Sequence, residues 1–461
     1  MYLKQEVQTT RILAVIAVSL SIVIAMLDST IANVALPVIA REFNVPASAS
    51  ILIVNAYQFA VVASLLPLAA LGKSIGNKRV FEAGVVLFAI SSLGCALSET
   101  LNTLTVFRVI QGFGAAAILS VNAALIKEIY PTRLLGRGLG INVMIVSVSA
   151  AAGPSIASAI LSISSWHWLF IINVPIAIAS LMLSVFFLDK RNPSGAQFDR
   201  KGAVLVFTLA MMFSFFVMGL TKEIAVMAMV SFAASVLILE VLYQDQRRKA
   251  DKALIPIALF NNKTLSLSLM MSTLSYSTQL LAYVSLPFYF HNVLHRDVVE
   301  TGLLLTAWPL ATTVTSLAAG ELLKRYDCNI IASVGLCLLL AGMVLMGILP
   351  AIPDNTDIIW RVALCGAGFG LFQSPNNYLI MTSVSDENTS VASGLLGSSR
   401  LLGQIIGSAM VAIYFNIIEA QAIEFSLLSG AGFCLLSLIV SFLRYIQSLK
   451  NRVIIPDDKT Q

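Results

Sequence analysis

The sequence predicts an all-α membrane protein whose fourteen transmembrane helices form two six-helix bundles with an inserted central hairpin. The first observation behind this prediction is the composition. Of 461 residues, 58% are hydrophobic and 11% charged, and the mean hydropathy is +0.88. A soluble domain carries about 25% charged residues, so a soluble enzyme, a disordered chain and a nucleic-acid-binding protein are excluded. The other two observations are a series of long apolar windows and an internal repeat.

Fourteen windows are long enough for a helix of roughly 20 apolar residues to cross the hydrocarbon core of a bilayer. The first window contains Asp28 and is too long for a cleavable signal, so we expect it to remain as the first helix. The expected spans are 12–36, 49–71, 80–98, 102–126, 138–162, 166–188, 202–220, 224–243, 264–289, 299–322, 329–349, 358–381, 391–415 and 421–443.

The lysines and arginines indicate how these spans are oriented. With a cytoplasmic N-terminus, 23 of the 29 basic residues fall in cytoplasmic segments, 3 in outer loops and 3 within spans. Under the positive-inside rule, this bias predicts that both termini are cytoplasmic. The basic loop 244–263 is then explained by topology and by contact with the lipid bilayer, rather than by a binding partner.

An internal repeat relates the two halves of the chain. Residues 110–126 align without gaps with 364–380 at an offset of 254, and six positions are identical, among them Gly112 and Gly366. Two weaker matches, at residues 34–37 and 71–73, occur at offsets of 250 and 251. Chance similarity between apolar helices is the alternative, but three matches at nearly one offset favour a true repeat.

The repeat predicts the domain organisation. It pairs span one with span nine and span four with span twelve, which leaves spans seven and eight as an inserted hairpin. In transporters with parallel six-helix repeats, the substrate site lies between the halves near the middle of the membrane. The expected domains are an N-terminal six-helix bundle (1–188), linkers with the central two-helix hairpin (189–263, spans about 202–220 and 224–243), a C-terminal six-helix bundle (264–445) and a cytoplasmic tail (446–461).

Asp28 is the only acidic residue well inside an expected span, and an ionisable group at such a depth is a functional candidate. At about 1.5 Å per residue, Asp28 lies about 12 Å from the outer end of span one, and Arg108 about 9 Å from the outer end of span four. Because these depths agree, we expect the two side chains to interact if both spans face one cavity. The pKa of an arginine is too high for it to carry the proton itself. Asp28 is therefore the expected proton carrier and Arg108 its charge partner, and a static ion pair between two helices is the alternative.

Amide and aromatic side chains recur along single helix faces at the 100° spacing of an α-helix. Such stripes suit a bulky, partly apolar ligand in a shared cavity. For any single stripe, hydrogen bonds between helices explain the pattern equally well. The predicted substrate-binding residues are Asn33, Asn55, Gln58, Gln111, Asn122, Tyr276, Gln279, Tyr283, Gln373, Asn376, Arg400 and Gln404.

What the sequence lacks narrows the function further. It has no Gly-rich nucleotide loop followed by Lys and Ser or Thr, so ATP is not the expected energy source. It has no grouping of nucleophile and base, so an enzyme is not expected. The five cysteines lie in or beside apolar stretches without paired spacing and are interpreted as buried hydrophobic residues. The three histidines fall at the outer surface, so neither a metal site nor a cofactor is expected.

Several motifs together carry a resemblance along essentially the whole chain. Residues 27–37 read LDSTIANVALP, residues 108–114 read RVIQGFG, and span five contains Gly153-Pro154. Span six opens with WHWLFIINVP at 166–175, and span thirteen contains RLLGQ at 400–404. With these motifs the chain resembles the fourteen-span drug:proton antiporter branch of the major facilitator superfamily, the multidrug and quaternary ammonium efflux type.

The resemblance implies a proton-coupled antiporter that exports small amphipathic, cationic or neutral drug-like compounds by alternating access. It implies a monomer in the inner membrane of a bacterium, driven by the proton gradient, with the substrate, protons and the lipid bilayer as its partners. Asp28 and Arg108 take the proton-coupling roles, and Gly153 and Pro154 form a gating bend where the halves meet. Export of a single endogenous metabolite, and uniport or import, remain the alternatives.

Two departures from the family pattern qualify these expectations. The loop after span two usually reads Gly-x-x-x-Asp-Arg-x-Gly, but here it has Ala69, Lys73 and Ser74 at the first three defined positions. We therefore expect the gating charge network around Lys73 and Arg79 to be altered. The second half has no acid at depth, so monovalent or neutral substrates and few protons per cycle are expected.

Overall fold

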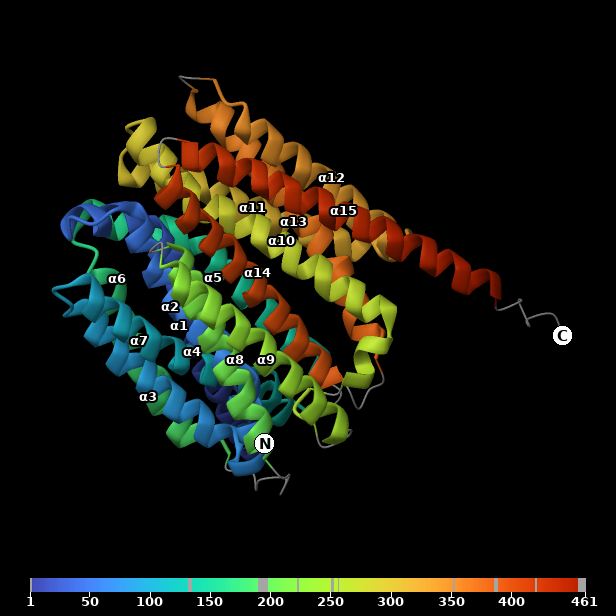
Figure 1. Cartoon of the computed structure of the whole chain (residues 1–461). Coiled ribbons are helices and arrows are strands. Elements are labelled where there is room, and N and C mark those ends of the chain that lie inside the picture. The colour runs from blue at the N-terminus through green and yellow to red at the C-terminus, as the bar shows by residue number, and fades with distance from the viewer. Residues whose placement is uncertain are drawn as a thin grey trace. The chain divides into compact units, whose positions relative to one another are not determined.

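The computed structural model describes residues 2–131, 135–189, 198–221, 224–249, 253–255, 257–350, 353–384, 389–418 and 421–454. Within these ranges all regular structure is helical, and fourteen helices have fifteen or more residues (Figure 1). They are α1 (Tyr2–Glu42), α2 (Ala47–Ile75), α3 (Asn77–Ala96), α4 (Leu101–Ile129), α5 (Leu135–Ile163), α7 (Asn173–Phe187), α8 (Arg200–Thr221), α9 (Ala225–Lys249), α10 (Lys263–Phe288), α11 (Val298–Leu322), α12 (Cys328–Gly347), α13 (Asn355–Thr382), α14 (Thr389–Ile417) and α15 (Ala422–Ile454). Three short segments complete the order: α6 (Trp168–Ile171), the 3-10 helix η3 (Ile257–Asn261) and the π-helix η4 (Tyr289–Val293).

The helices confirm an all-α membrane protein. Among the described residues, eleven helical stretches are long and apolar enough to cross a membrane, with α6 and α7 forming one of them. Helices α10 and α13 match expected spans nine and twelve but are less apolar, because they carry several hydroxyl and amide side chains. In α5, the apolar stretch Ala152–Ile163 is shorter than the eleven stretches that could cross a membrane. The arrangement as fourteen membrane crossings therefore stays a prediction.

The chain forms two compact units. Unit 1 comprises residues 1–257, 283–306 and 408–423, and unit 2 comprises residues 258–282, 307–407 and 424–461. Because parts of α10, α11 and α14 belong to unit 1, the units differ from the two expected six-helix bundles. The boundaries of those bundles thus remain a prediction.

Helix α1 is the centre of unit 1. It contacts α2, α4, α5, α6 and α7, and Ala17, Val18 and Ile22 are fully buried on it. Ser21 of α1 is hydrogen-bonded to Ser180 of α7 at 2.5 Å. These contacts enclose α1 on several sides, so an ionisable side chain in its middle is removed from solvent.

The close contacts of glycines confirm the internal repeat. A Cβ atom on Gly112 of α4 would collide with the carbonyl oxygen of Tyr57 in α2, and one on Gly366 of α13 would collide with that of Trp308 in α11. Trp308 follows Tyr57 by 251 residues, which is one of the offsets found in the sequence. The next glycine of each motif makes the same close approach, to α3 in unit 1 and to α12 in unit 2. The same three-helix packing is thus built twice.

Local hydrogen bonds explain where several helices begin. Thr100 starts α4 with a reciprocal capping box to Thr103. Asp327 and Asp354 accept backbone N–H bonds at the starts of α12 and α13. Between α2 and α3 the chain turns at Gly76, whose φ of 105° favours glycine.

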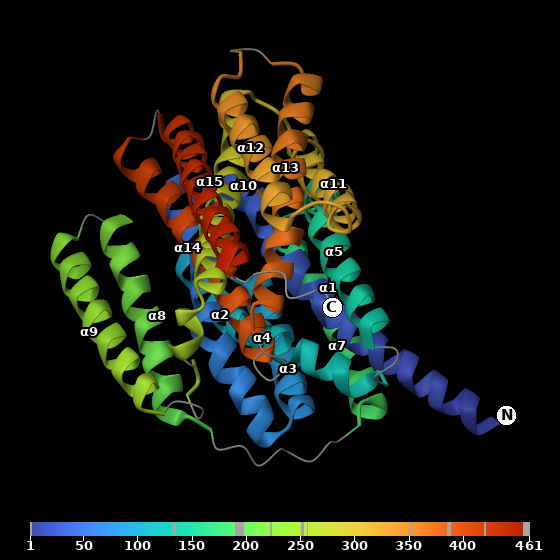
Figure 2. The same cartoon turned by 90° about the vertical axis from the view of Figure 1, so that its right-hand side faces the viewer.

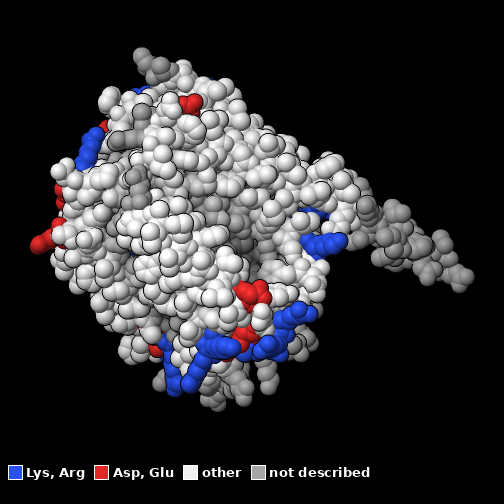
Figure 3. Space-filling view, viewed as in Figure 1, with Lys and Arg blue, Asp and Glu red and all other residues white. Residues whose placement is uncertain are grey.

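Helices α8 and α9 form the central hairpin and lie side by side (Figures 1 and 2). Helix α8 packs on α2, where the rings of Phe213 and Phe59 are 6.2 Å apart. Exposed apolar residues of α9, such as Val226 and Leu237, suit contact with lipid. In Figure 3, Lys and Arg gather at the edge of the molecule where the hairpin begins and ends, and the surface above it is almost free of charge.

Candidate functional site

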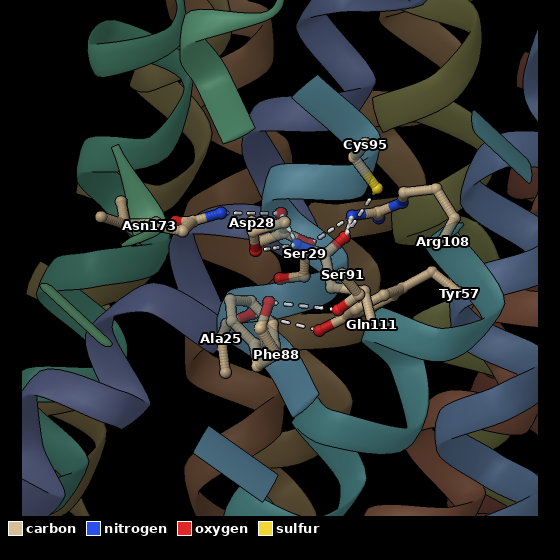
Figure 4. Close-up of polar contacts among 12 residues, drawn as sticks. Ala25, Asp28, Ser29, Tyr57, Phe88, Ser91, Cys95, Arg108, Gln111 and Asn173 are labelled. Atoms are coloured by element: carbon tan, nitrogen blue, oxygen red, sulfur yellow. Dashed lines mark hydrogen bonds and ion pairs between the residues drawn. The ribbon is translucent and has the colours of Figure 1, made fainter. Parts of the chain in front are cut away.

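The site in unit 1 is built around an ion pair between Asp28 of α1 and Arg108 of α4. Only 2% of the Asp28 side chain and 1% of the Arg108 side chain are exposed. Nη1 of Arg108 donates to Oδ2 of Asp28, and Figure 4 shows the carboxylate between Arg108 and Asn173. The structure thus brings together the two residues whose equal depth predicted an interaction.

Two amides complete the hydrogen bonds to Asp28. Nε2 of Gln111, one turn after Arg108 on α4, donates to Oδ1 of Asp28 at 3.0 Å, and Nδ2 of Asn173 on α7 donates to the same oxygen at 3.2 Å. Nη1 of Arg108 also donates to Oε1 of Gln111 at 2.6 Å. Residues of α3 hold Gln111 in place, since its Nε2 donates to Ser92 at 2.8 Å. The carboxylate therefore accepts hydrogen bonds from two helices, α4 and α7, and α3 supports Gln111.

Aromatic rings cover the guanidinium. Cζ of Arg108 lies 4.2 Å from the ring centroid of Tyr57 on α2 and 5.6 Å from that of Phe170 on α6. The hydroxyl of Tyr57 donates to the carbonyl of Ala25 on α1 at 3.5 Å. Such cation–π contacts stabilise a cation and also exclude water from it. Together with the surrounding helices, these rings leave only 1% of the Arg108 side chain exposed.

The break between α6 and α7 places Asn173 at the start of α7. Pro175 has no backbone N–H to donate, so it fits in the first turn of a helix. Before the break, Nε1 of Trp166 donates to Glu42 of α1 at 2.8 Å, which ties the loop to the end of α1. The segment 166–175 is thus attached to α1 at two places, and one of them is Asp28.

This arrangement can couple a proton to a movement of helices. An isolated buried charge is costly, and Asp28 and Arg108 compensate each other only while the carboxylate is ionised. Protonation of Asp28 would leave the guanidinium without its anionic partner, and the pair would then separate more easily. Among the residues that the structure describes, Nε of Arg108 and Oδ1 of Asn173 have no hydrogen-bond partner. The site therefore keeps two polar atoms available for a rearrangement.

A second group of predicted residues meets in unit 2. Nε2 of Gln373 on α13 donates to the hydroxyl of Tyr276 on α10 at 2.7 Å. Cζ of Arg400 on α14 lies 5.5 Å from the ring centroid of Tyr276. The Tyr276 ring meets the edge of Phe369 on α13 at 5.1 Å and 83°. Three helices thus bring two rings, an amide and a guanidinium together.

Asn376 belongs to a different network. Its Nδ2 donates to Ser268 and Ser272 of α10 at 3.0 Å, and its Oδ1 accepts from Arg444 of α15 at 2.6 Å. Arg444 is 2% exposed and also donates to Asn329 of α12 at 2.9 Å. The amide of Asn376 therefore joins helices in this structure, which is the alternative given for a single polar stripe.

The other predicted substrate-binding residues are dispersed. Asn33 donates to Ser29 on its own helix at 3.4 Å, and Asn122 of α4 donates to Asn142 of α5 at 3.3 Å. In the described part of the chain, both polar atoms of Asn55 and Oε1 of Gln58 are buried without a hydrogen-bond partner. Three residues are half-buried: Gln279 and Tyr283 on α10, and Gln404 on α14.

The predicted gating residues lie at two places. Gly153 of α5 packs against Thr30 of α1, and the carbonyl of Pro154 lies against Gly302 of α11, so this segment contacts two helices closely. Lys73 and Arg79 are exposed on either side of the turn at Gly76. Next to them, Asn77 donates to Glu128 of α4 at 2.7 Å, a bond that joins α3 to α4 in the altered loop.

The sequence reasoning missed five members of the site around Asp28, namely Asn173, Tyr57, Phe170, Ser92 and Cys95. Asn173 was noted only as part of a motif, and Tyr57 lies beside the amide stripe of α2 rather than in it. Ser92 and Cys95 carry weak signals, because small polar residues and cysteines are common in buried helices. In the structure, Sγ of Cys95 lies 3.6 Å from Oε1 of Gln111 and donates to it. The position of Asn173 after a helix break, before a proline, was the signal that could have identified it.

The fold is that of an all-α membrane protein, and the comparison with known families identifies it as a membrane transport protein rather than an enzyme. The chain matches the Major Facilitator Superfamily over residues 18–408, and it belongs to that family of secondary transporters.

Individual relatives agree with this assignment. The chain is 45% identical over 439 residues to the "Uncharacterized transporter YebQ" of Escherichia coli, which covers 94% of this chain and 95% of that protein. It is 25% identical to the riboflavin transporter RibZ of Clostridioides difficile (87% and 88% covered) and 26% identical to the multidrug resistance protein Stp of Mycobacterium tuberculosis (87% and 75%). The crystal structure of a point mutant of the nucleoside transporter NupG has a TM-score of 0.67 at 12% identity, covering 95% of this chain and all of that one. That similarity supports the fold.

Proposed function

We propose that the protein is a proton-coupled antiporter that exports small amphipathic compounds across a bacterial inner membrane by alternating access. Asp28 carries the proton, and Arg108 is its charge partner. The observation that carries this proposal is the buried pair itself. Among the described residues, the buried acids are Asp28 and Asp245, and Asp245 lies at the base of the hairpin.

The relatives support export as the direction. Several of them are named as drug resistance or efflux proteins, including the multidrug resistance protein Stp and the drug efflux pump JefA of Mycobacterium tuberculosis. The riboflavin transporter RibZ favours a second candidate, a transporter dedicated to one endogenous metabolite.

The basic loops agree with cytoplasmic termini, which a cysteine-accessibility assay at each end of the chain tests.

Proton exchange is tested in inverted membrane vesicles that hold a pH gradient reported by a quenched dye. A panel of lipophilic compounds is added to vesicles with the wild type, with Asp28→Asn and with Asp357→Asn. Asp357 is the control, because it is also paired with an arginine, Arg361 at 3.0 Å, but near the start of α13. We expect dequenching in the wild type and in Asp357→Asn, and none in Asp28→Asn. An equal response of all three would show that Asp28 is structural, and no response to any compound would favour a dedicated metabolite.

A further inference from the structure

Arg400 is a guanidinium held between two helices of unit 2. A Cβ atom on Gly403 of α14 would collide with the carbonyl oxygen of Thr273 on α10, and Gly407 lies as close to Ser277. These two glycines, four residues apart, let α14 approach α10 closely. Arg400 is one turn before Gly403, so its side chain is held over the ring of Tyr276.

Arg400 differs from the other arginines that lie over aromatic rings. Arg108 is paired with Asp28, and Arg361, 5.0 Å from the ring centroid of Trp360, is paired with Asp357. In the described residues Arg400 forms no ion pair with a carboxylate, and its buried Nε has no hydrogen-bond partner. No buried acid is found in the described part of unit 2. A guanidinium within a membrane helix is costly without an anion, so this position favours a ligand that supplies one.

The neighbouring hydroxyl is also oriented to donate. The oxygen of Tyr276 accepts from Gln373, so its own O–H remains to bond an acceptor. Beside it, the ring of Phe369 contacts the ring of Tyr276. The ring centroids of Phe369 and Trp308 are 6.4 Å apart. Arg400 and Tyr276 thus offer hydrogen-bond donors, and buried aromatic rings pack behind Tyr276.

From this arrangement we propose that Arg400, Tyr276 and Gln373 bind the anionic head group of an aromatic substrate. This substrate class deepens the proposed export function and rests on it. It differs from the cation that the family resemblance implied, because a cation would face a guanidinium with no acid to compensate it. The planar guanidinium suits a sulfonate or carboxylate with two oxygen acceptors.

The test uses three naphthalenes that differ only in the head group: naphthalene-2-sulfonate, naphthalene-2-sulfonamide and 2-naphthyltrimethylammonium. Binding to the full-length purified protein in nanodiscs is measured by isothermal titration calorimetry, with empty nanodiscs subtracted. We expect the sulfonate to bind at least about tenfold more tightly than the trimethylammonium compound, with the sulfonamide between them. Arg400→Gln should weaken sulfonate binding about tenfold and change sulfonamide binding by less than about twofold. Arg400→Lys should retain part of the preference.

Two further variants make the result specific. Arg361→Gln removes an arginine that also lies over a ring, and it should leave all three affinities unchanged. Asp28→Asn should keep the preference for the anion while losing the proton response, so the two proposals can fail separately. Tighter binding of the cation by the wild type, or an anion preference that survives Arg400→Gln, would overturn the assignment. Thermal unfolding of each variant shows whether a lost affinity is a loss of fold.

Discussion

The side-chain amide of Asn173 donates a hydrogen bond of 3.2 Å to the carboxylate of Asp28, although the two residues lie 145 positions apart in the chain. A hydrogen bond to a buried charged group contributes about 1.5–3 kcal/mol. This bond connects the start of α7 to the ion pair, so changes in the charge of Asp28 act directly on α7.

We therefore expect Asn173→Ala to lower proton-coupled transport about tenfold, because the ionised carboxylate loses one of its three donors. The measurement is the initial rate of dequenching in inverted vesicles at several pH values. The control is Asn102→Ala, since Asn102 is an exposed amide on α4. Equal pH–rate profiles for Asn173→Ala and the wild type would show that the bond is incidental to transport.

The repeated glycines predict matched losses of stability. Gly112→Ala and Gly366→Ala each place a methyl group against a backbone carbonyl, at a cost of about 1–3 kcal/mol. Because the sites lie in different units, the two effects should add. Thermal unfolding in detergent measures them. Gly432→Ala on α15 is the control, since a Cβ atom there meets nothing within 4 Å, and it should unfold like the wild type.

A buried lysine holds the end of α7. Nζ of Lys78 on α3 donates to the carbonyls of Val185 and Leu188 at 3.1 and 2.6 Å. These carbonyls are at the C-terminal end of α7, where the helix dipole also stabilises a positive charge. Lys78→Met leaves these carbonyls unpaired, and we expect it to destabilise the protein by about 1–3 kcal/mol. The neighbouring Arg79→Met removes an exposed charge and should have little effect on the unfolding temperature. Equal melting of both variants would contradict this role for Lys78.

The base of the hairpin predicts a pH dependence. Burial raises the pKa of Asp199, but hydrogen bonds from Gln246 at 3.0 Å and Lys249 at 2.6 Å outweigh it, so the pKa lies below its ordinary value. Because the pKa of Asp199 is lower in the folded protein, its ionised carboxylate stabilises the fold. This stabilisation is complete above the pKa of the unfolded chain, about 3.9, and is lost as the pH falls through the pKa of the folded protein. We therefore expect the base of the hairpin to be equally stable between pH 8 and pH 5 and to lose stability only below about pH 4.

Hydrogen exchange at the start of α8 measures this effect. Asp199 also accepts from the backbone N–H of Gly202 at 2.9 Å, as a helix cap does. A cap contributes about 1 kcal/mol, so Asp199→Ala at pH 7 should speed exchange of the first turn about fivefold, whereas Asp199→Asn keeps an oxygen that can accept this bond. Arg200→Gln is the control, because Arg200 is an exposed residue of the same turn. Exchange that already rises between pH 7 and pH 5 in the wild type would contradict the prediction.

The sequence was sufficient for the helices and for the central ion pair. Apolar windows predicted the helices because a membrane helix must bury its backbone polar groups and present an apolar surface. The depth of Asp28 and Arg108 along their spans predicted their contact, because helix rise is nearly constant. Their role in carrying protons stays a prediction.

The partners of single amides could not be predicted in this way. Asn376 and Gln373 lie on one face of α13, yet one joins Arg444 and the other joins Tyr276. The choice depends on which helix is adjacent, and helical spacing alone does not contain that information. For the same reason the burial of Lys78, which lies between expected spans two and three, could not be predicted: it is buried because the end of α7 lies beside it.

If Asp28 carries the proton as proposed, the ion pair makes the transporter sensitive to voltage in only one half of its cycle. While Asp28 is ionised, the pair carries no net charge, and the membrane potential does almost no work on moving it. Once a proton is bound, the guanidinium remains and the site carries one positive charge. A full charge that crosses 100 mV gains or loses about 2.3 kcal/mol. In the proposed mechanism, the electric field across the membrane would therefore act on the proton-loaded form and leave the unloaded form nearly unaffected.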